Sequence, residues 1–147
     1  MTAKEIQKHL VEKYHDKEIC LSNFYIDLWE ADVFRLHDNG QYTEYEVKIS
    51  RSDFFADFKK KRSKKLKHEE IQKGKRCNKF YFVVPEGLVK VEEVPIYCGL
   101  IYCTPTGLTV KRRAKQIHTT QIDSKYYKQL AKKLYFKIKD NKLHLPK

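Results

Sequence analysis

Three residues in the first third of the chain have the types that metal-assisted hydrolysis needs. Glu46 and Lys48 are separated by one residue, and Asp32 lies upstream of them, before a short Asp38-Asn39-Gly40 turn. Successive side chains of a strand alternate between its two faces, so Glu46 and Lys48 project in the same direction. Two carboxylates and a lysine brought together in this way can hold a divalent metal ion beside a water molecule that attacks a phosphodiester.

The length of the turn decides whether the two carboxylates meet. A two-residue loop places Asp32 opposite Val47, and Glu46 then points to the other face of the sheet. A three-residue loop, with glycine in the left-handed position, pairs His37 with Gln41 and places Asp32 opposite Glu46. We therefore expect the three-residue loop, because only this loop length brings both carboxylates to one site.

The same register also satisfies burial. It places Glu30 opposite Lys48 on the polar face. It gathers the apolar residues of the two strands on the other face, as one core surface made of Ala31, Val33, Tyr45, Val47 and Ile49. One pairing of the strands thus serves both the core and the chemistry.

A metal ion suits such opposed carboxylates, which otherwise repel each other and raise each other's pKa. Oxygen ligands favour Mg²⁺ or Mn²⁺ over zinc, and the backbone carbonyl of Val47 is a candidate ligand in addition to Asp32 and Glu46. The four cysteines form no CxxC pair of the kind that zinc sites use. Lys48 is placed to orient the water or to neutralise charge that develops on the phosphate.

The charge of the chain indicates a polyanionic partner. Its 147 residues carry 31 basic and 19 acidic side chains, a net charge of +12, which makes nucleic acid the first candidate and an anionic membrane surface the second. No apolar run approaches the roughly 18 residues that span a bilayer, and the start of the chain has no apolar signal segment. We expect a single domain over residues 1–147 in the cytoplasm, bound to DNA and not to a membrane.

The residue pattern predicts an α/β domain. Apolar spacing predicts a helix over residues 3–15, a second helix from Ser50 that runs into a basic segment and ends by Gly74, and a final helix from Asp123 or Ser124. The apolar side of the final helix is expected to carry Tyr127, Leu130, Leu134 and Ile138. Strand patterns occupy residues 24–28, 30–36, 42–49, 79–84, 97–103 and 108–112.

Two basic segments are candidate phosphate contacts. In residues 59–67 seven of nine side chains are basic, and so dense a run of like charges destabilises a helix unless a counter-charge arrives. A second group occupies residues 111–115. The candidate DNA contacts are therefore Arg51, Lys59, Lys60, Lys61, Arg62, Lys64, Lys65, Lys67, Lys111, Arg112, Arg113 and Lys115. Such contacts hold a nucleic-acid backbone without reading its sequence.

The order of the elements and one longer run of residues resemble a known family. The order helix, strand, strand with Asp32, strand with Glu46-Val47-Lys48, helix, strand resembles the PD-(D/E)XK nuclease superfamily. The run YEVKISRSDFFADFK, from Tyr45 to Lys59, is similar to a stretch of its small MmcB-related, DNA-repair-type branch. The resemblance covers roughly residues 30–103. It implies a restriction-endonuclease-like fold, a mixed β-sheet flanked by helices with an αβββαβ core, here followed by a C-terminal helix.

The resemblance also implies roles for individual residues. Asp32 and Glu46 would ligate Mg²⁺ or Mn²⁺, and Lys48 would serve the cleavage of DNA. Some members of the superfamily add a glutamate from the first helix, for which Glu5 and Glu12 are the candidates here. Two features depart from the pattern: Asp32 is not preceded by proline, and the basic insertion over residues 60–75 is longer than the branch leads us to expect.

Two further acidic residues flank the site. Glu30 faces Lys48 in the preferred register and is a candidate additional ligand. Asp57 follows on the next helix, where it either pairs with a lysine or supports the site from behind the metal ligands. The sequence leaves both roles of Asp57 open.

Three functions are open from the sequence. The first is a metal-dependent deoxyribonuclease in DNA repair, recombination or phage or host genome processing, near the nucleoid of a bacterial or phage-infected cell. The second is a DNA-binding protein of the same fold that does not cleave, although two facing carboxylates would repel DNA unless a cation joined them. The third is an RNA-binding or RNA-processing protein. A homodimer is expected if both strands of a duplex are cut, since each chain has one site.

Overall fold

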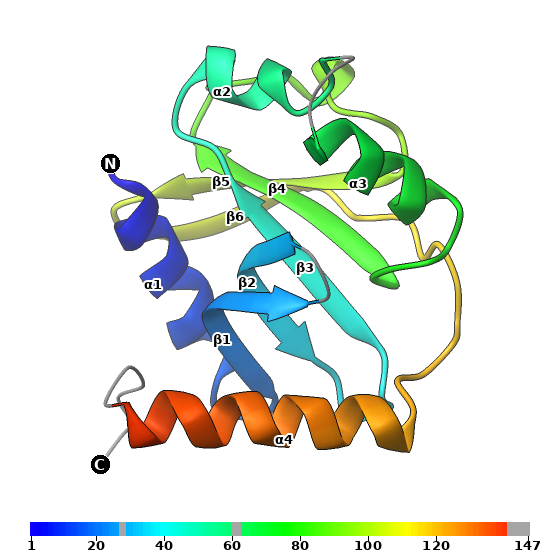
Figure 1. The fold of residues 1–147 in the computed structure, drawn as a ribbon. Helices are drawn as coiled ribbons and strands as arrows, with labels where there is room; N and C mark the ends of the chain where they lie inside the picture. The colour runs from blue at the N-terminus through cyan, green and yellow to red at the C-terminus, as the bar shows by residue number, and fades with distance from the viewer. Residues whose placement is uncertain (27–28, 60–62, 141–147) are drawn as a thin grey trace.

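The protein forms a mixed sheet of six strands flanked by helices, as the sequence predicts (Figure 1). The computed structural model describes residues 1–26, 29–59 and 63–140. Its elements follow the chain as α1 (Ala3–Tyr14), β1 (Ile19–Ile26), β2 (Trp29–Leu36), β3 (Tyr42–Val47), α2 (Arg51–Ala56), α3 (Ser63–Gln72), β4 (Lys79–Pro85), the short 3-10 helix η1 (Val91–Glu93), β5 (Cys98–Thr104), β6 (Gly107–Arg112) and α4 (Ser124–Lys139). The predicted order of helices and strands is therefore confirmed, except that two helices lie between β3 and β4 where one is predicted.

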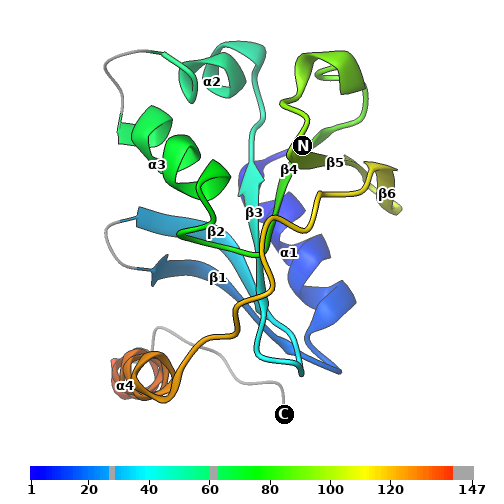
Figure 2. The ribbon, with the colours of Figure 1, turned by 90° about the vertical axis from the view of Figure 1, so that its right-hand side faces the viewer.

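The six strands lie in the sheet in the order in which they occur in the chain. The pairs β1–β2, β2–β3 and β5–β6 are antiparallel, while β3–β4 and β4–β5 are parallel. A parallel pair needs a crossover, and α2 and α3 form the one between β3 and β4. Figures 1 and 2 show α1 on one face of the sheet and α2 and α3 on the other.

Strand β3 is buried on both sides because each face of the sheet has its own core. Under α1, Ile6 and Leu10 pack in a cluster with Tyr45 and Val47. On the opposite face α2, α3 and α4 cover an aromatic cluster that includes Phe82. All the residues of β3 are buried. Its polar side chains must therefore find partners inside the protein, since an unpaired buried charge is costly.

Two helix starts follow the local rules that the sequence displays. The Thr2 hydroxyl accepts a hydrogen bond from the Glu5 N–H at 3.2 Å, and the Glu5 carboxylate accepts one from the Thr2 N–H at 3.1 Å. This is a complete capping box. The Ser50 hydroxyl likewise accepts a hydrogen bond from the Asp53 N–H at 3.2 Å and caps α2.

Helix α2 is shorter than the sequence predicts, and the prediction of one helix that runs into the basic segment is wrong. At its end, the N–H of Asp57 donates a hydrogen bond to the Phe54 carbonyl, and the N–H of Lys59 donates one to the Ala56 carbonyl. These bonds span three residues, which is the tight 3-10 geometry common at helix ends. A second helix, α3, begins at Ser63. The break turns the inward face of α3 toward β3.

Helix α4 packs on the sheet with only part of the predicted face, because Leu130 and Leu134 pack in the core but the other two predicted residues do not. Leu130 is buried, whereas Tyr127 and Ile138 of the expected apolar side are exposed. The ammonium groups of Lys133 and Lys137 donate to the backbone carbonyls of Tyr25 and Asn23 in the edge strand β1. Lysines thus attach α4 to the sheet edge. None of the helices within the described residues is long and apolar enough to pass through a membrane.

Candidate functional site

The turn between β2 and β3 has the predicted geometry. The His37 N–H donates to the Gln41 carbonyl at 2.9 Å, and Gly40 has a φ of +83°. The paired residues run from Leu36 opposite Tyr42 to Val33 opposite Tyr45. This is the register expected from a three-residue loop, so the expected strand pairing is confirmed for these four pairs, which end one short of the predicted Asp32–Glu46 pair.

Beyond Val33 a side chain takes the place of the backbone ladder. The Asp32 carboxylate accepts a hydrogen bond from the Val47 N–H at 2.8 Å through its Oδ2. Gln7 of α1 donates from its side-chain nitrogen to the Asp32 carbonyl and to the Asn23 side chain, both at 3.0 Å. Asp32 therefore lies where β2 separates from β3, held on one side by α1 and on the other by the backbone of β3.

Three details of the predicted hairpin are wrong for this reason. Glu30 pairs with Tyr25 across β1, in place of the expected position opposite Lys48. Ala31 belongs to the core under α2 and α3, and Ile49 is exposed. The β2–β3 ladder ends before these positions, so the alternation that predicts them no longer applies.

The electrostatic environment of Asp32 favours its neutral form. Burial, followed by the negative charge of Glu46, raises the pKa of Asp32 to about 7, against the opposing effects of the Val47 N–H, Lys64 and Lys48. The influence of Glu46 means that the two carboxyl groups are close enough to repel each other. A cation between them would remove this repulsion.

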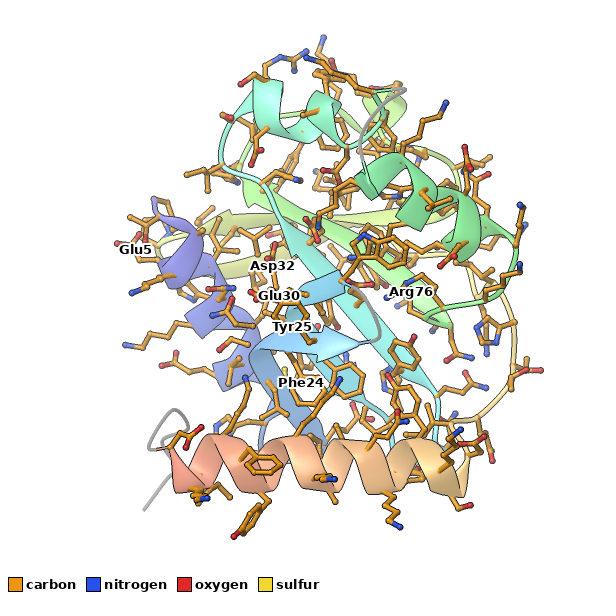
Figure 3. The ribbon with its side chains drawn as sticks, in the orientation of Figure 1. Glu5, Phe24, Tyr25, Glu30, Asp32 and Arg76 are labelled. Carbon is orange, nitrogen blue, oxygen red and sulfur yellow. The ribbon has the colours of Figure 1, made fainter. Side chains whose placement is uncertain are left out.

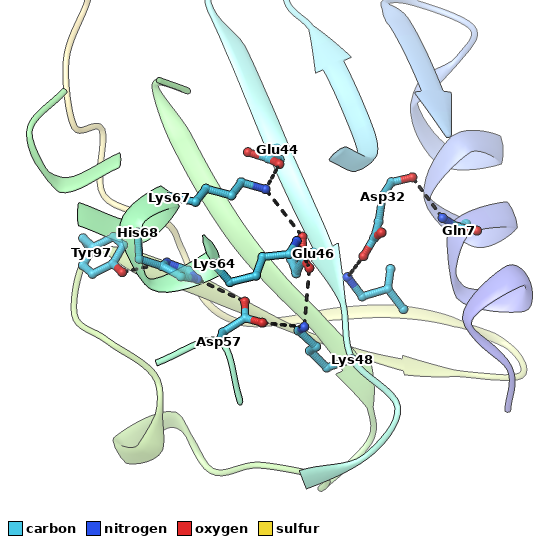
Figure 4. Close-up of polar contacts among 11 residues, drawn as sticks. Gln7, Asp32, Glu44, Glu46, Lys48, Asp57, Lys64, Lys67, His68 and Tyr97 are labelled. Carbon is cyan, nitrogen blue, oxygen red and sulfur yellow. Dashed lines mark hydrogen bonds and ion pairs between the residues drawn. The ribbon is translucent and has the colours of Figure 1, made fainter. Parts of the chain in front are cut away.

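Glu46 is surrounded by three lysines and still has one unsatisfied oxygen (Figure 4). Its Oε1 lies 2.7 Å from the ammonium of Lys64 and 3.4 Å from that of Lys48. Its Oε2 lies 3.7 Å from the ammonium of Lys67, beyond hydrogen-bond distance. This Oε2 atom is buried and has no hydrogen-bond partner, an arrangement that native structures rarely leave without a ligand, water or ion.

Lys48 is held from behind by a carboxylate. Its ammonium donates to Asp57 Oδ1 at 2.6 Å, and the effects of Glu46 and Asp57 outweigh burial, so the pKa of Lys48 is raised. Burial acts to raise the pKa of Asp57, but hydrogen bonds from His68 and Lys48 outweigh it, and its pKa is lowered. Asp57 therefore pairs with a lysine, which is one of its two predicted roles, and its support of a metal site stays a prediction.

Helix α3 supplies residues that sequence reasoning placed elsewhere. Lys67 is fully buried and its ammonium is bonded to Glu44, so the prediction that it contacts DNA phosphate is wrong. His68 is also buried, at 3% exposure. Lys64, Lys67, His68 and Ile71 have the i, i+3, i+4, i+7 spacing of one helix face, but three of the four are polar, so no apolar pattern marks that face as the inward one.

The first helix does not bring a glutamate to the site. Glu5 is engaged in the capping box with Thr2, and Glu12 is exposed and lies 3.8 Å from Lys8. Figure 3 shows Glu5 on the outer side of α1, apart from Asp32. The prediction that one of these glutamates is a ligand is therefore wrong. The residue of α1 that does reach β2 is Gln7.

The predicted DNA contacts divide into groups. The side chains of Lys59, Lys111, Arg113 and Lys115 are exposed, and those of Lys64 and Lys65 are partly exposed. The prediction that Arg112 contacts phosphate is wrong, because its guanidinium donates to four backbone carbonyls, those of Val91, Val94, Pro95 and Cys98. Arg51 is exposed but its guanidinium lies 2.6 Å from a Glu93 oxygen. Lys60, Lys61 and Arg62 lie outside the described residues.

The oxygen donors of Asp32 and Glu46 are of the chemical type that Mg²⁺ and Mn²⁺ prefer. The unsatisfied Glu46 Oε2 and the raised pKa of Asp32 are both features that a hard divalent cation would relieve. Within residues 1–26, 29–59 and 63–140 no three His, Cys, Asp or Glu side chains gather as a metal site. The Val47 carbonyl, water or substrate oxygens would have to complete the coordination.

Comparison with known proteins gives information about the fold and not about the function. No protein-family model matches the chain, and no curated protein matches its sequence. Among solved structures, the chain is similar to the SPO1766 protein of unknown function from Silicibacter pomeroyi, with 16% identity and a TM-score of 0.67. The match covers 99% of this chain and 96% of that chain. At this identity the likeness shows a common fold.

Proposed function

We propose that this protein is a Mg²⁺- or Mn²⁺-dependent phosphodiesterase that hydrolyses DNA. The observation that carries the proposal is the buried, unsatisfied Oε2 of Glu46, together with Asp32, which is bonded to the N–H of Val47, the residue after Glu46, and has a pKa raised to about 7. A divalent cation would satisfy both groups, and the net charge of +12 supports a polyanion such as DNA as the substrate. The resemblance of residues 45–59 to PD-(D/E)XK nucleases supports the same activity.

Each residue of the site has a distinct task in this proposal. Asp32, Glu46 and the Val47 carbonyl would hold the metal ion, which when bound activates water and polarises the scissile phosphate. Lys48 presents a fixed positive charge beside Glu46, where it stabilises charge that develops on the phosphate. Asp57 keeps that ammonium in place. The setting we propose is DNA repair, recombination or genome processing in the cytoplasm of a bacterial or phage-infected cell.

The test is a cleavage assay on single-stranded, duplex and branched DNA, with and without Mg²⁺ or Mn²⁺. We expect cleavage of at least one of these substrates in the presence of the metal and none in the presence of a chelator. Binding without cleavage on all three substrates would reject the proposal. Gel filtration with and without duplex DNA would show whether the chain acts as the homodimer that double-strand cleavage requires.

One observation favours a second candidate, a DNA-binding protein of this fold that does not cleave. The Lys64 ammonium lies 2.7 Å from Glu46 Oε1, and the Glu46 side chain is 4% exposed while that of Lys64 is 30% exposed. Lys64 thus approaches Glu46 from the solvent side and occupies the position of a cation. If it never withdraws, the carboxylates have their counter-charge and the site has no place for a metal.

Lys64→Met separates the two candidates. If Lys64 competes with a metal ion, removal of its ammonium raises Mn²⁺ affinity about 10-fold, the equivalent of about 1.4 kcal/mol. Titration followed by the electron paramagnetic resonance of free Mn²⁺ measures this affinity directly, and Lys65→Met on the same helix is the matched control. Equal Mn²⁺ affinity in the wild type and both variants would favour the non-cleaving protein.

The exposed basic residues predict a salt dependence. Lys65→Gln removes one phosphate contact, so it should weaken the binding of all DNA sequences alike and make the slope of log K against log salt less steep by about 0.9. Fluorescence anisotropy at several salt concentrations measures that slope, with Lys8→Gln on α1 as a control. Figure 2 shows β6 and α3 on separate parts of the molecule, so Lys111→Gln tests the second basic group independently. An unchanged slope in Lys65→Gln would remove α3 from the DNA interface.

A further inference from the structure

A chain of buried polar groups leads away from Lys48 into the core (Figure 4). The Lys48 ammonium donates to Asp57 Oδ1 at 2.6 Å, and Asp57 Oδ2 lies 3.1 Å from His68 Nε2. His68 Nδ1 lies 2.8 Å from the hydroxyl of Tyr97. All four side chains are buried. They come from the end of β3, the end of α2, the middle of α3 and the residue before β5, so tertiary structure alone assembles them.

The hydrogen bonds of the chain have one consistent direction when His68 is neutral. Asp57 has a lowered pKa and is ionised, so it accepts from both Lys48 and His68 Nε2. A neutral imidazole that donates from Nε2 must accept at Nδ1, and the donor there is the Tyr97 hydroxyl. Burial raises the pKa of Tyr97, so this hydroxyl keeps its proton. Every member of the chain then has a partner.

The surroundings give no local reason for these residue types. The His68 ring lies among aromatic rings, 4.9 Å from that of Phe58 and 5.2 Å from that of Phe80 between centroids. Asp57 is at the C-terminal cap of α2, where the helix dipole disfavours a carboxylate. Apolar residues of similar size would pack in such a core at least as stably as buried charged groups. What the polar chain provides is a fixed position for one ammonium group.

We propose that Asp57, His68 and Tyr97 are positioning residues that hold the Lys48 ammonium beside Glu46. Tyr97 fixes the imidazole tautomer, the imidazole fixes the Asp57 carboxylate, and the carboxylate fixes Lys48. The catalytic consequence rests on the function proposed above, whereas the positioning of Lys48 does not.

Nitrogen-15 NMR of the lysine ammonium groups and of the His68 ring tests the positioning in the intact protein. Tyr97→Phe removes one hydroxyl at constant shape. We expect the His68 Nδ1 resonance to shift and the Lys48 ammonium protons to exchange severalfold faster with water. Lys67, which is buried and bonded to Glu44, is the internal reference and should be unaffected. Tyr102→Phe is the matched control, because it removes a hydroxyl that donates to the Val89 carbonyl.

Asp57→Asn provides a second reading that does not depend on Tyr97. It weakens the direct bond to Lys48, so the Lys48 ammonium should exchange faster still than in Tyr97→Phe. Unchanged Lys48 exchange in both Asp57→Asn and Tyr97→Phe would overturn the proposal. So would equal acceleration of the Lys48 and Lys67 signals, which would indicate general loosening of the core.

Measurement of kcat and KM for DNA cleavage extends the test to catalysis. The substrates are a single-stranded oligonucleotide and a plasmid, each assayed in the presence of Mn²⁺. Tyr97→Phe should lower kcat about 10-fold with KM unchanged, as supporting hydrogen bonds behind a site commonly do. His68→Gln retains a donor for Asp57 and should keep more activity than His68→Leu, which retains none. A rise in KM at constant kcat would count against the positioning role. If the wild type does not cleave, the proposed function fails, and the Lys48 signal still decides the positioning.

Discussion

Lys48→Gln is expected to lower kcat for DNA cleavage in Mg²⁺ by about 10³-fold, the size of effect seen when a fixed charge or donor at a transition state is lost. The Lys48 ammonium lies beside Glu46 and is held by Asp57. A neutral amide at this position keeps hydrogen-bonding capacity but lacks the charge that stabilises the developing phosphate negative charge. DNA affinity should change little, because the Lys48 charge acts on the phosphate as it reacts, whereas the exposed lysines hold the DNA in the ground state.

Single-turnover cleavage with labelled DNA measures the rate of the chemical step, and fluorescence anisotropy measures binding. Lys79→Gln, on the neighbouring strand β4, is the control for loss of one positive charge. A circular dichroism spectrum checks that Lys48→Gln is folded, and Glu46→Gln supplies an independent variant of the same site. Cleavage at the wild-type rate in both variants would reject the site assignment.

Asp32→Asn is expected to remove a pH dependence of stability. The pKa of Asp32 rises from an ordinary value of 3.8 to about 7 in the folded protein, so the folded state holds this proton more tightly than the unfolded chain. Stability from this group is therefore full below about pH 4 and is lost as pH rises to about 7. The difference between the two pKa values corresponds to a loss of about 4 kcal/mol in the free energy of unfolding.

Urea denaturation between pH 4 and pH 8 in a chelator measures this loss as the difference between the wild type and Asp32→Asn. Asp38→Asn, which changes an exposed carboxylate in the adjacent turn, is the matched control. Saturating Mn²⁺ should restore wild-type stability above pH 7, by about 2.7 kcal/mol at a hundred times Kd, and should do little for Asp32→Asn. The same pH dependence in the wild type and Asp32→Asn would mean that Asp32 is not the titrating group.

Local rules were sufficient to predict the turn of the β2–β3 hairpin and the starts of α1 and α2. A turn with glycine at its left-handed position leaves few registers, and the burial of Val33, Tyr45 and Val47 on one face selects among them. The caps at Thr2 and Ser50 depend on residues three apart in the chain. Such interactions act within a few residues, so the sequence displays them directly. The catalytic and metal-binding roles drawn from this hairpin stay predictions.

The partners of Glu46 were not predictable in the same way. In α3 the apolar Leu66 is 52% exposed while the neighbouring Lys67 is fully buried, which reverses the usual reading of hydropathy. The reversal occurs because Glu44 and Glu46 of β3 face that side of the sheet and need positive charges. A pattern within one helix carries no record of the charges on a distant strand.

The sequence by itself determined the order of the elements, the register of the β2–β3 hairpin and the closeness of Glu46 to Lys48, because each depends on residues near one another in the chain. Tertiary structure alone decided that Lys64 lies on Glu46, that Asp57 holds Lys48, and that Gln7 is the α1 residue that reaches Asp32. Those contacts join separate elements through buried charges, and a buried charge is satisfied by whichever partner the fold brings within reach.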